Sequence, residues 1–176
     1  MNIDDMIEEV LKKEGGYVNH KLDKGGATNL GITQDTLSNY IKRRASIQEV
    51  KSLTREMAAR IYKENYYFAH KIDKLPEIIQ PILFDVSVNS GGSRAVKMLQ
   101  QILFDLNYPI GLADGVIGAK TVKYSKEWVD TVGSHAINTI VEYRKKFYRK
   151  IIDANPSQVA FEKGWMARAN SFIVKV

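Results

Sequence analysis

The sequence contains no cysteine, and its three histidines, His20, His70 and His135, lie far apart along the chain. Disulfides and thiolate metal sites are therefore excluded, and we expect no zinc site, no other metal and no cofactor. No apolar run approaches the ~20 residues that a membrane-spanning helix needs, so no stable membrane insertion is expected. The acidic opening "MNIDDMIEEVLKK" lacks the apolar core of a signal peptide. This predicts synthesis in the cytoplasm without a cleavable leader.

The composition is that of a folded globular protein, with 44% apolar and 26% charged residues in a chain of 176. That length suffices for one domain or for two small ones. The net charge of +6 favours an anionic partner. Nucleic acid, membrane headgroups and bacterial cell wall all carry negative charge, so charge alone leaves the class of function open.

The hydrophobic pattern predicts a mostly α-helical protein. Asn2 caps a first helix whose apolar positions recur every three to four residues until Gly15 and Gly16 end it. "GYV" and "TNLGIT" then predict two short strands around a "DKGG" turn, which form a small N-terminal hairpin. Pro81 is expected to kink the helix predicted at residues 76–90 or to divide it in two. Further helices are predicted at residues 34–43, 54–68, 76–90, 93–107, 118–129, 133–153 and 156–173.

Glu14 is a candidate general acid at the end of the first helix. It continues the buried stripe of Ile7, Val10 and Leu11, and it lies where the negative end of the helix dipole opposes a carboxylate. Both effects favour the protonated form, which the general acid of glycoside hydrolysis requires. A boundary glutamate beside two capping glycines is the alternative without a catalytic role.

Asp23 follows in a Gly-rich turn between Lys21 and Lys24, which are expected to keep its carboxylate ionised. An acid and an ionised carboxylate in different environments form a plausible acid/base pair. A hydroxyl or amide from Thr28 or Asn29, facing Asp23 across the hairpin, would help to hold an attacking water. Turn formation and strand packing are the ordinary roles of all three residue types.

The stretch "EGGYVNHKLDKGGATNLGIT", residues 14–33, resembles the signature of glycoside hydrolase family 108. This family comprises phage and bacterial N-acetylmuramidases, which are lysozyme-like endolysins also called secretion activator proteins. The resemblance continues through "ARIYKENYYFAHKIDKLP" and "FDVSVNSG", and it covers about residues 5–92. Beyond it, "AVKMLQQILF" and "ADGVIGAKT" resemble the predicted peptidoglycan-binding domain that accompanies this enzyme.

The resemblance implies a mostly α, lysozyme-like α+β fold, in which a helical bundle carries a small β-hairpin next to the active site. It implies a muramidase domain at 1–92 and a helical peptidoglycan-binding domain at 93–176, closely packed on the first. The implied reaction is hydrolysis of the β-1,4 bond between N-acetylmuramic acid and N-acetylglucosamine. Glu14 would protonate the glycosidic oxygen, while Asp23, helped by Thr28 or Asn29, would activate water; inversion and retention both remain open.

Aromatic and amide side chains are the candidates for substrate contact, although each is also typical of a protein core or a helix cap. These residues are Tyr17, Asn29, Tyr66, Tyr67 and Asn89.

The segment "EYRKKFYRK", residues 142–150, interleaves basic and aromatic residues. A helix with Tyr143, Phe147 and Ile151 inward and Arg144 solvated is the expected arrangement. As a functional surface, the same face would attract anionic wall polymer or nucleic acid.

Peptidoglycan glycan strands are the expected partner, and the protein is expected to reach the periplasm by holin-like or other release. A catalytically silent peptidoglycan-binding or export-associated protein is the alternative. Nucleic-acid binding is a weaker one, because no base-reading motif supports it. The sequence leaves the oligomeric state open, with a monomer favoured.

Overall fold

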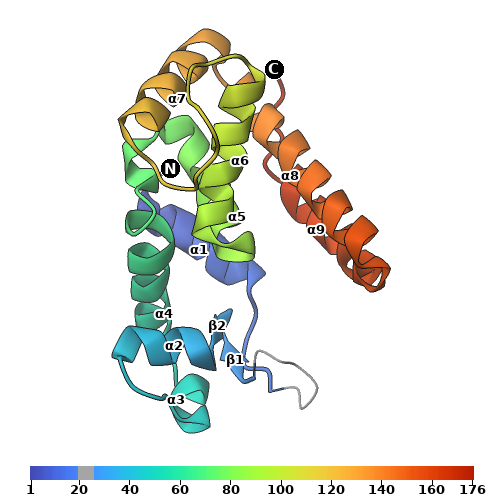
Figure 1. Ribbon diagram of the computed structural model, residues 1–176. Coiled ribbons are helices and arrows are strands. Elements are labelled where there is room, and N and C mark those ends of the chain that lie inside the picture. Colours follow the sequence, from blue (N-terminus) through green and yellow to red (C-terminus); the bar gives the residue numbers. More distant parts are fainter. Residues whose placement is uncertain (20–25) are drawn as a thin grey trace. The chain divides into compact units, whose positions relative to one another are not determined.

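The computed structural model describes residues 1–19 and 26–176, and the chain is helical along most of this length (Figure 1). It forms two compact units, Met1–Tyr66 and Tyr67–Val176. The prediction of a mostly helical protein with a small sheet near the N-terminus is confirmed. None of the helices in the described ranges is long and apolar enough to cross a membrane.

The first unit begins with the predicted amphipathic helix, α1 (Ile3–Lys13). Asn2 and Asp5 form a capping box, in which each side chain accepts a hydrogen bond from the other residue's backbone N–H. One face of the helix is buried through Met6, Ile7, Val10 and Leu11. The spacing of these apolar residues therefore fixes which side of α1 faces the core of the unit.

The hairpin is shorter than predicted and lies entirely within "TNLGIT". Strand β1 (Thr28–Asn29) pairs antiparallel with β2 (Ile32–Thr33). Leu30 and Gly31 join them with φ values of +52° and +76°, as a type I′ turn requires. The prediction of a strand at "GYV" is wrong, because Val18 contributes only an isolated bridge to Thr28. Most of the predicted "DKGG" turn lies outside the described residues.

Three helices follow the hairpin in the first unit: α2 (Gln34–Ile41), α3 (Ile47–Lys51) and α4 (Arg55–Ile61). The helix α3 was not predicted, although Ser46 and Glu49 form the capping box that its sequence allows. From Tyr62 to Phe68 the chain continues as a π-helix, η1, where an α-helix was predicted. Seven residues of π-helix are unusual, and such segments occur frequently at functional sites.

The second unit is built around α5 (Gln80–Ser90), whose residues from Ile82 to Ser87 are all buried. Two short 3-10 turns, η2 (Ile72–Lys74) and η3 (Glu77–Ile79), precede it. Pro81 lies in the first turn of α5, where its missing N–H leaves no intrahelical bond unmade. The helix predicted over 76–90 is therefore divided at this point and not kinked.

Helix α6 (Gly92–Asp105) packs on α5, and its buried Gln100 organises the loop that follows. The amide Nε2 of Gln100 donates to the Asp114 carboxylate at 2.9 Å and to the Val116 carbonyl at 3.0 Å. Its Oε1 accepts from the Gly115 N–H at 2.9 Å. The "DGVIG" segment is thus a hydrogen-bonded turn, while Leu112 earlier in the loop is 87% exposed.

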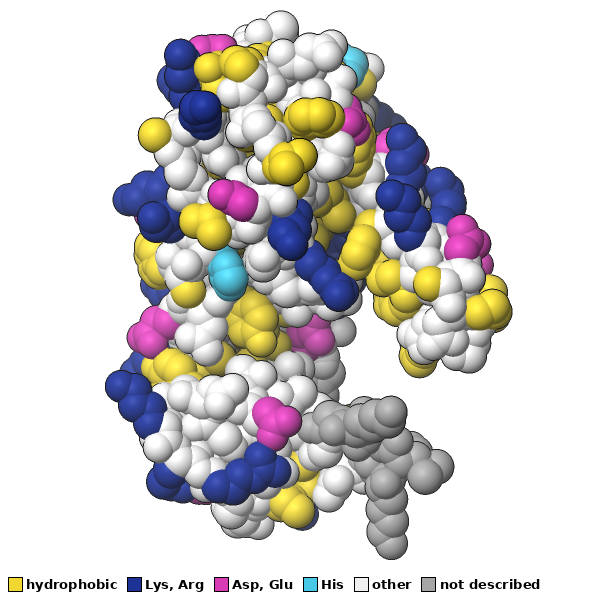
Figure 2. All heavy atoms as spheres, in the orientation of Figure 1, with side chains coloured by type: hydrophobic (Ala, Val, Ile, Leu, Met, Phe, Trp, Pro, Cys, Tyr) yellow, Lys and Arg dark blue, Asp and Glu magenta, His cyan; other side chains and the backbone are white. Residues whose placement is uncertain are grey.

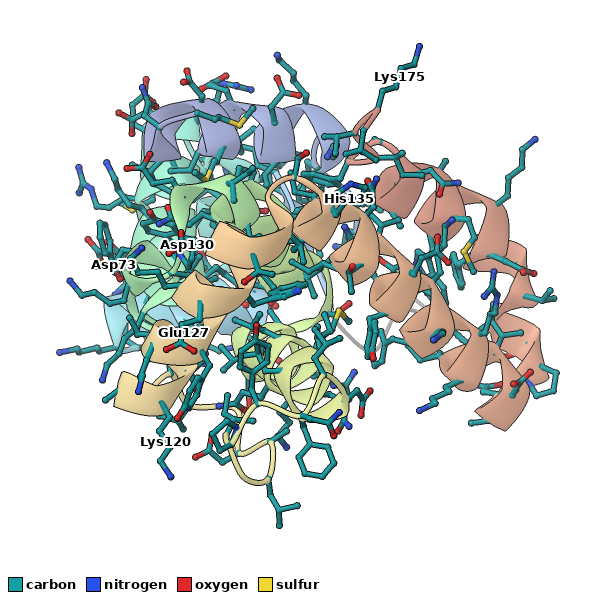
Figure 3. The ribbon with its side chains drawn as sticks, turned by 90° about the horizontal axis from the view of Figure 1, so that it is seen from above. Asp73, Lys120, Glu127, Asp130, His135 and Lys175 are labelled. Atoms are coloured by element: carbon teal, nitrogen blue, oxygen red, sulfur yellow. The ribbon has the colours of Figure 1, made fainter. Side chains whose placement is uncertain are left out.

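Two long helices and a shorter one complete the second unit: α7 (Ala119–Val132), α8 (His135–Ala154) and α9 (Glu162–Asn170). Lys120, Glu127 and Asp130 project from α7, and His135 begins α8 (Figure 3). The 3-10 helix η4 (Pro156–Phe161) leads into α9, so the helix predicted over 156–173 is α-helical only in its second part.

The orientation of α8 differs from the prediction. Arg144 is fully buried and Tyr148 is 1% exposed, whereas Tyr143 and Phe147 are only half-buried. The reason is the buried Asp85 of α5, whose carboxylate accepts a 2.7 Å hydrogen bond from Arg144 Nη2. An ion-pair partner elsewhere in the chain therefore outweighs the local hydrophobic pattern.

Candidate active site

Glu14 is the C-cap of α1, and its backbone N–H donates to the Val10 carbonyl at 3.1 Å. Its φ and ψ of −90° and −8° are still close to helical, and Gly15 then takes a φ of +66°. That left-handed conformation is the usual glycine termination of a helix. The side chain of Glu14 is half-buried.

The tip of the hairpin lies directly against Glu14. A Cβ atom added to Gly31 would stand 2.8 Å from Glu14 Oε2 and 3.0 Å from Glu14 Cβ, and it would also collide with the Tyr62 hydroxyl. Because Gly31 also has a φ of +76°, both its conformation and its surroundings require glycine. The backbone of the hairpin therefore forms one wall around the Glu14 carboxyl group.

Tyr62 fixes this wall from the other side. It is 1% exposed, and its hydroxyl donates to the Leu30 carbonyl at 2.6 Å. The bond holds the type I′ turn on the junction between α4 and η1. Sequence reasoning missed Tyr62 as a site residue, and no local pattern in the sequence pairs it with a carbonyl that lies 32 positions earlier.

Asp23, Thr28 and Asn29 are the proposed partners of Glu14, and the last two are described. Asp23 lies outside the described residues. Thr28 lies on β1, where its backbone exchanges two 2.8 Å hydrogen bonds with Val18 and its hydroxyl lies 3.5 Å from the Val18 carbonyl. Thr28 is half-buried.

Asn29 has a structural contact that accounts for its burial. It is 8% exposed, and its Nδ2 donates at 3.1 Å to the carbonyls of both Val50 and Lys51. Both carbonyls lie at the C-terminal end of α3, where carbonyls have no partners inside the helix, and that of Val50 also accepts from the Leu53 N–H at 3.2 Å. The Asn29 amide nitrogen thus ties the hairpin to α3.

Two of the predicted aromatic contacts belong to the first unit. Tyr66 is half-buried, and its ring lies 5.6 Å from that of Tyr62. Tyr17 is also half-buried, and Lys51 Nζ stands 5.5 Å from its ring centroid. The structure therefore brings Glu14, Gly31, Tyr62 and Tyr66 into one continuous set of contacts.

The remaining two candidates, Tyr67 and Asn89, belong to the second unit. Tyr67 is 6% exposed, donates to Gln80 Oε1 at 2.7 Å and packs edge-on against Phe84. Burial, with the nearby negative charges of Asp73 and Glu77, raises the pKa of the Tyr67 hydroxyl. Asn89 Oδ1 accepts a 2.6 Å hydrogen bond from the Tyr148 hydroxyl.

The centre of the candidate site is the carboxyl group of Glu14. Within residues 1–19 and 26–176 there is no group of three or more His, Cys, Asp or Glu side chains that could hold a metal ion. A carboxyl group fixed at a helix end, walled by backbone and by an aromatic hydroxyl, can deliver a proton to an oxygen placed before it. A carboxyl group so placed in a mostly helical fold is the arrangement that the general acid of a lysozyme-like glycoside hydrolase requires.

Comparison with known proteins identifies the family. Residues 7–91 match the family described as "Glycosyl hydrolase 108", and residues 94–170 match a "Predicted Peptidoglycan domain". A solved structure, that of Brucella abortus SagA, is 36% identical with a TM-score of 0.79, over 97% of this chain and 90% of that one. No curated protein matches the sequence. The chain belongs to the glycosyl hydrolase 108 family.

The two family matches do not coincide with the two compact units. The matches meet between residues 91 and 94, whereas the units divide between Tyr66 and Tyr67. The domain boundary expected between residues 92 and 93 stays a prediction. Helix α5 lies within the hydrolase match but folds with α6 and α8 of the second unit.

Proposed function

We propose that this protein is an N-acetylmuramidase, a lysozyme that cleaves the β-1,4 bond between N-acetylmuramic acid and N-acetylglucosamine. The observation that carries the proposal is the placement of Glu14 at the end of α1, against Gly31 of the hairpin. Membership of the glycosyl hydrolase 108 family supports the same reaction class.

Glu14 acts as the general acid and protonates the glycosidic oxygen as the bond breaks. Asp23, assisted by Thr28, orients and activates the attacking water. Asn29 is the weaker candidate for this assistance, because its amide nitrogen is already bonded to two carbonyls of α3. Gly31 and Tyr62 position Glu14 and the hairpin without taking part in proton transfer.

The stereochemical outcome depends on the separation of the Glu14 and Asp23 carboxyl groups. About 6.5–9.5 Å leaves room for a water and gives inversion, whereas about 5–5.5 Å makes the second carboxylate a nucleophile and gives retention. NMR of the first anomer released from a soluble glycan decides between the two. Asp23→Asn is expected to slow hydrolysis in either case.

The decisive experiment is digestion of purified peptidoglycan, followed by mass analysis of the products. Fragments that end in reducing N-acetylmuramic acid identify a muramidase, and Glu14→Gln is expected to lower their release by about 10²–10⁴-fold. Glu9→Gln is the matched control, because Glu9 lies on the exposed face of the same helix and pairs with Lys12. Equal release by the wild type and by Glu14→Gln would refute the mechanism.

The competing function is a catalytically silent peptidoglycan-binding or export-associated protein. In that case the wild type binds the wall but releases no reducing ends. We further propose that the enzyme acts at the cell wall as an endolysin of phage type, and that it reaches the wall by holin-like release. Lysis on co-expression with a holin, but not with Glu14→Gln in place of the wild type, tests this proposal.

A further inference from the structure

A cavity of about 630 Å³ opens between α6 and α8 of the second unit. We call it the α6–α8 cavity. Its lining combines two aromatic rings with four cationic side chains: Arg94, Lys97, Tyr143, Lys146, Phe147 and Lys150. In Figure 2, dark blue Lys and Arg side chains lie on both sides of yellow hydrophobic ones in the space between α6 and α8.

The lining of the α6–α8 cavity carries more positive than negative charge. All four cationic residues are exposed, and none of them forms an ion pair within the part of the chain that is described. The lining also includes one carboxylate, that of Asp105, which accepts hydrogen bonds from the Tyr143 hydroxyl at 2.6 Å and from Gln101 Nε2 at 2.8 Å. These bonds and the positive charges of Lys146 and Lys150 lower the pKa of Asp105. Four cations against one carboxylate leave the lining with an excess of three positive charges. This excess of positive charge favours the binding of an anionic ligand.

Two of the cations are held over the aromatic rings. The Arg94 guanidinium carbon lies 5.6 Å from the Phe147 ring centroid, and Lys146 Nζ lies 5.0 Å from that of Tyr143. Such cation–π contacts hold the charges beside an apolar surface. A ligand that fits must therefore present negative groups next to aliphatic or ring carbon.

Peptidoglycan offers this combination in only one of its two parts. The glycan strand consists of N-acetylated sugars whose lactyl carboxyl groups are consumed in amide bonds, so it carries no negative charge to complement the positive lining. The peptide stem carries free carboxylates beside aliphatic side chains. The positive lining of the cavity is therefore complementary in charge to the peptide stem and not to the glycan strand.

We propose that the α6–α8 cavity binds the peptide stem of peptidoglycan through its free carboxylates. The proposal rests on peptidoglycan being the substrate of the protein, as proposed above. Glu14 belongs to the first unit and performs the cleavage, whereas the α6–α8 cavity belongs to the second unit and selects glycan that still carries peptide. The cavity thereby makes stem peptides a determinant of substrate choice.

The test uses the full chain carrying Glu14→Gln, so that the ligand is not consumed. Binding of a soluble muramyl tetrapeptide is measured by calorimetry before and after the double change Lys146→Gln with Lys150→Gln. Loss of two partly solvated ion pairs is expected to weaken binding roughly tenfold. Lys120→Gln removes one charge from the exposed start of α7, outside the cavity (Figure 3), and is expected to leave the affinity unchanged.

Three outcomes would overturn the proposal. The first is that the double variant binds the muramyl tetrapeptide as tightly as its parent does. The second is that a tetrapeptide whose carboxylates are converted to amides binds as tightly as the unmodified one. The third is that the double change weakens the binding of duplex DNA but not that of the muramyl peptide. Digestion of intact, peptide-bearing peptidoglycan by the otherwise unchanged enzyme is scored separately. A wild type that releases no reducing ends refutes the proposed function, whereas unchanged peptide binding refutes only the role of the cavity.

Discussion

Asp85 and Arg144 form a buried ion pair with an Nη2 to Oδ2 distance of 2.7 Å, and the pair joins regions that match two different families. Asp85 is 1% and Arg144 is 0% exposed. Arg168 of α9 adds two further hydrogen bonds to the same carboxylate, at 3.0 and 3.1 Å. The last helix of the hydrolase match is therefore held by charge to the peptidoglycan-domain match.

Asp85→Asn is expected to destabilise the protein by about 3–5 kcal/mol, because it leaves two arginines without the carboxylate that compensates their burial. Urea unfolding measures the loss. Asp130→Asn on α7 is the matched control, since its pair with Lys126 is mostly exposed (Figure 3) and is worth about 1 kcal/mol or less. Similar losses of unfolding free energy in the two variants would show that the buried ion pair contributes no more to stability than the exposed one.

Gly31→Ala is expected to lower both activity and stability. The new Cβ would meet the Glu14 carboxyl group and the Tyr62 hydroxyl, in addition to the cost of about 1–3 kcal/mol for a left-handed non-glycine residue. Gly111→Ala isolates the second effect, because Gly111 has a φ of +81° but no atom within 4 Å of its added Cβ. Reducing-end release should fall more than tenfold in Gly31→Ala only. Equal losses of activity and stability in the two variants would show that position 31 requires glycine only for its positive φ.

Tyr62→Phe is expected to cost about 1–3 kcal/mol, because it leaves the Leu30 carbonyl without its 2.6 Å partner. Since the same bond fixes the hairpin beside Glu14, we expect a lower kcat with little change in KM. Stability measured by urea unfolding and steady-state kinetics are both required. If Tyr62→Phe is destabilised but keeps its full kcat, Tyr62 does not position the catalytic site.

Burial, together with the hydrogen bond to Asp105, raises the pKa of Tyr143 to about 12. A raised pKa in the folded protein means that the protonated phenol is stabilised. This contribution is complete below the unfolded pKa of about 10 and is lost as the pH rises towards 12.

Phenolate absorbance tests this ionisation, by subtracting the titration of Tyr143→Phe from that of the wild type. The difference is expected to have its midpoint near pH 12, and Asp105→Asn is expected to move it lower. A wild-type midpoint at about 10 would mean that neither burial nor Asp105 acts on this hydroxyl.

The parts of the fold that sequence predicts are those decided by neighbouring residues. The first helix is fixed by Asn2, by its apolar stripe and by the glycines that follow Glu14, all within one short stretch. The hairpin was predicted in the right part of the chain but with its turn at "DKGG", whereas the observed turn lies inside "TNLGIT", which was predicted to be a single strand. Its register was not predicted, because a type I′ turn at Leu30 and Gly31 uses a leucine at positive φ, which is uncommon.

The parts that sequence did not predict depend on partners far along the chain. Arg144 was expected in solvent because its local pattern is that of a charged helix face, and only Asp85, 59 positions earlier, explains its burial. Tyr62 meets Leu30 across 32 positions and Asn29 meets Val50 across 21. No periodicity encodes such pairs.

The loop that follows α6 makes the protein well suited to optical measurement. Leu112 is 87% exposed, it is followed directly by Ala113 in the lining of the α6–α8 cavity, and Gln100 anchors the loop a few residues further on. Because the chain contains no cysteine, Leu112→Cys creates a unique thiol for a solvent-sensitive fluorophore. A dye at this position would report occupancy of the cavity in real time, while hydrolysis is followed independently in the same sample.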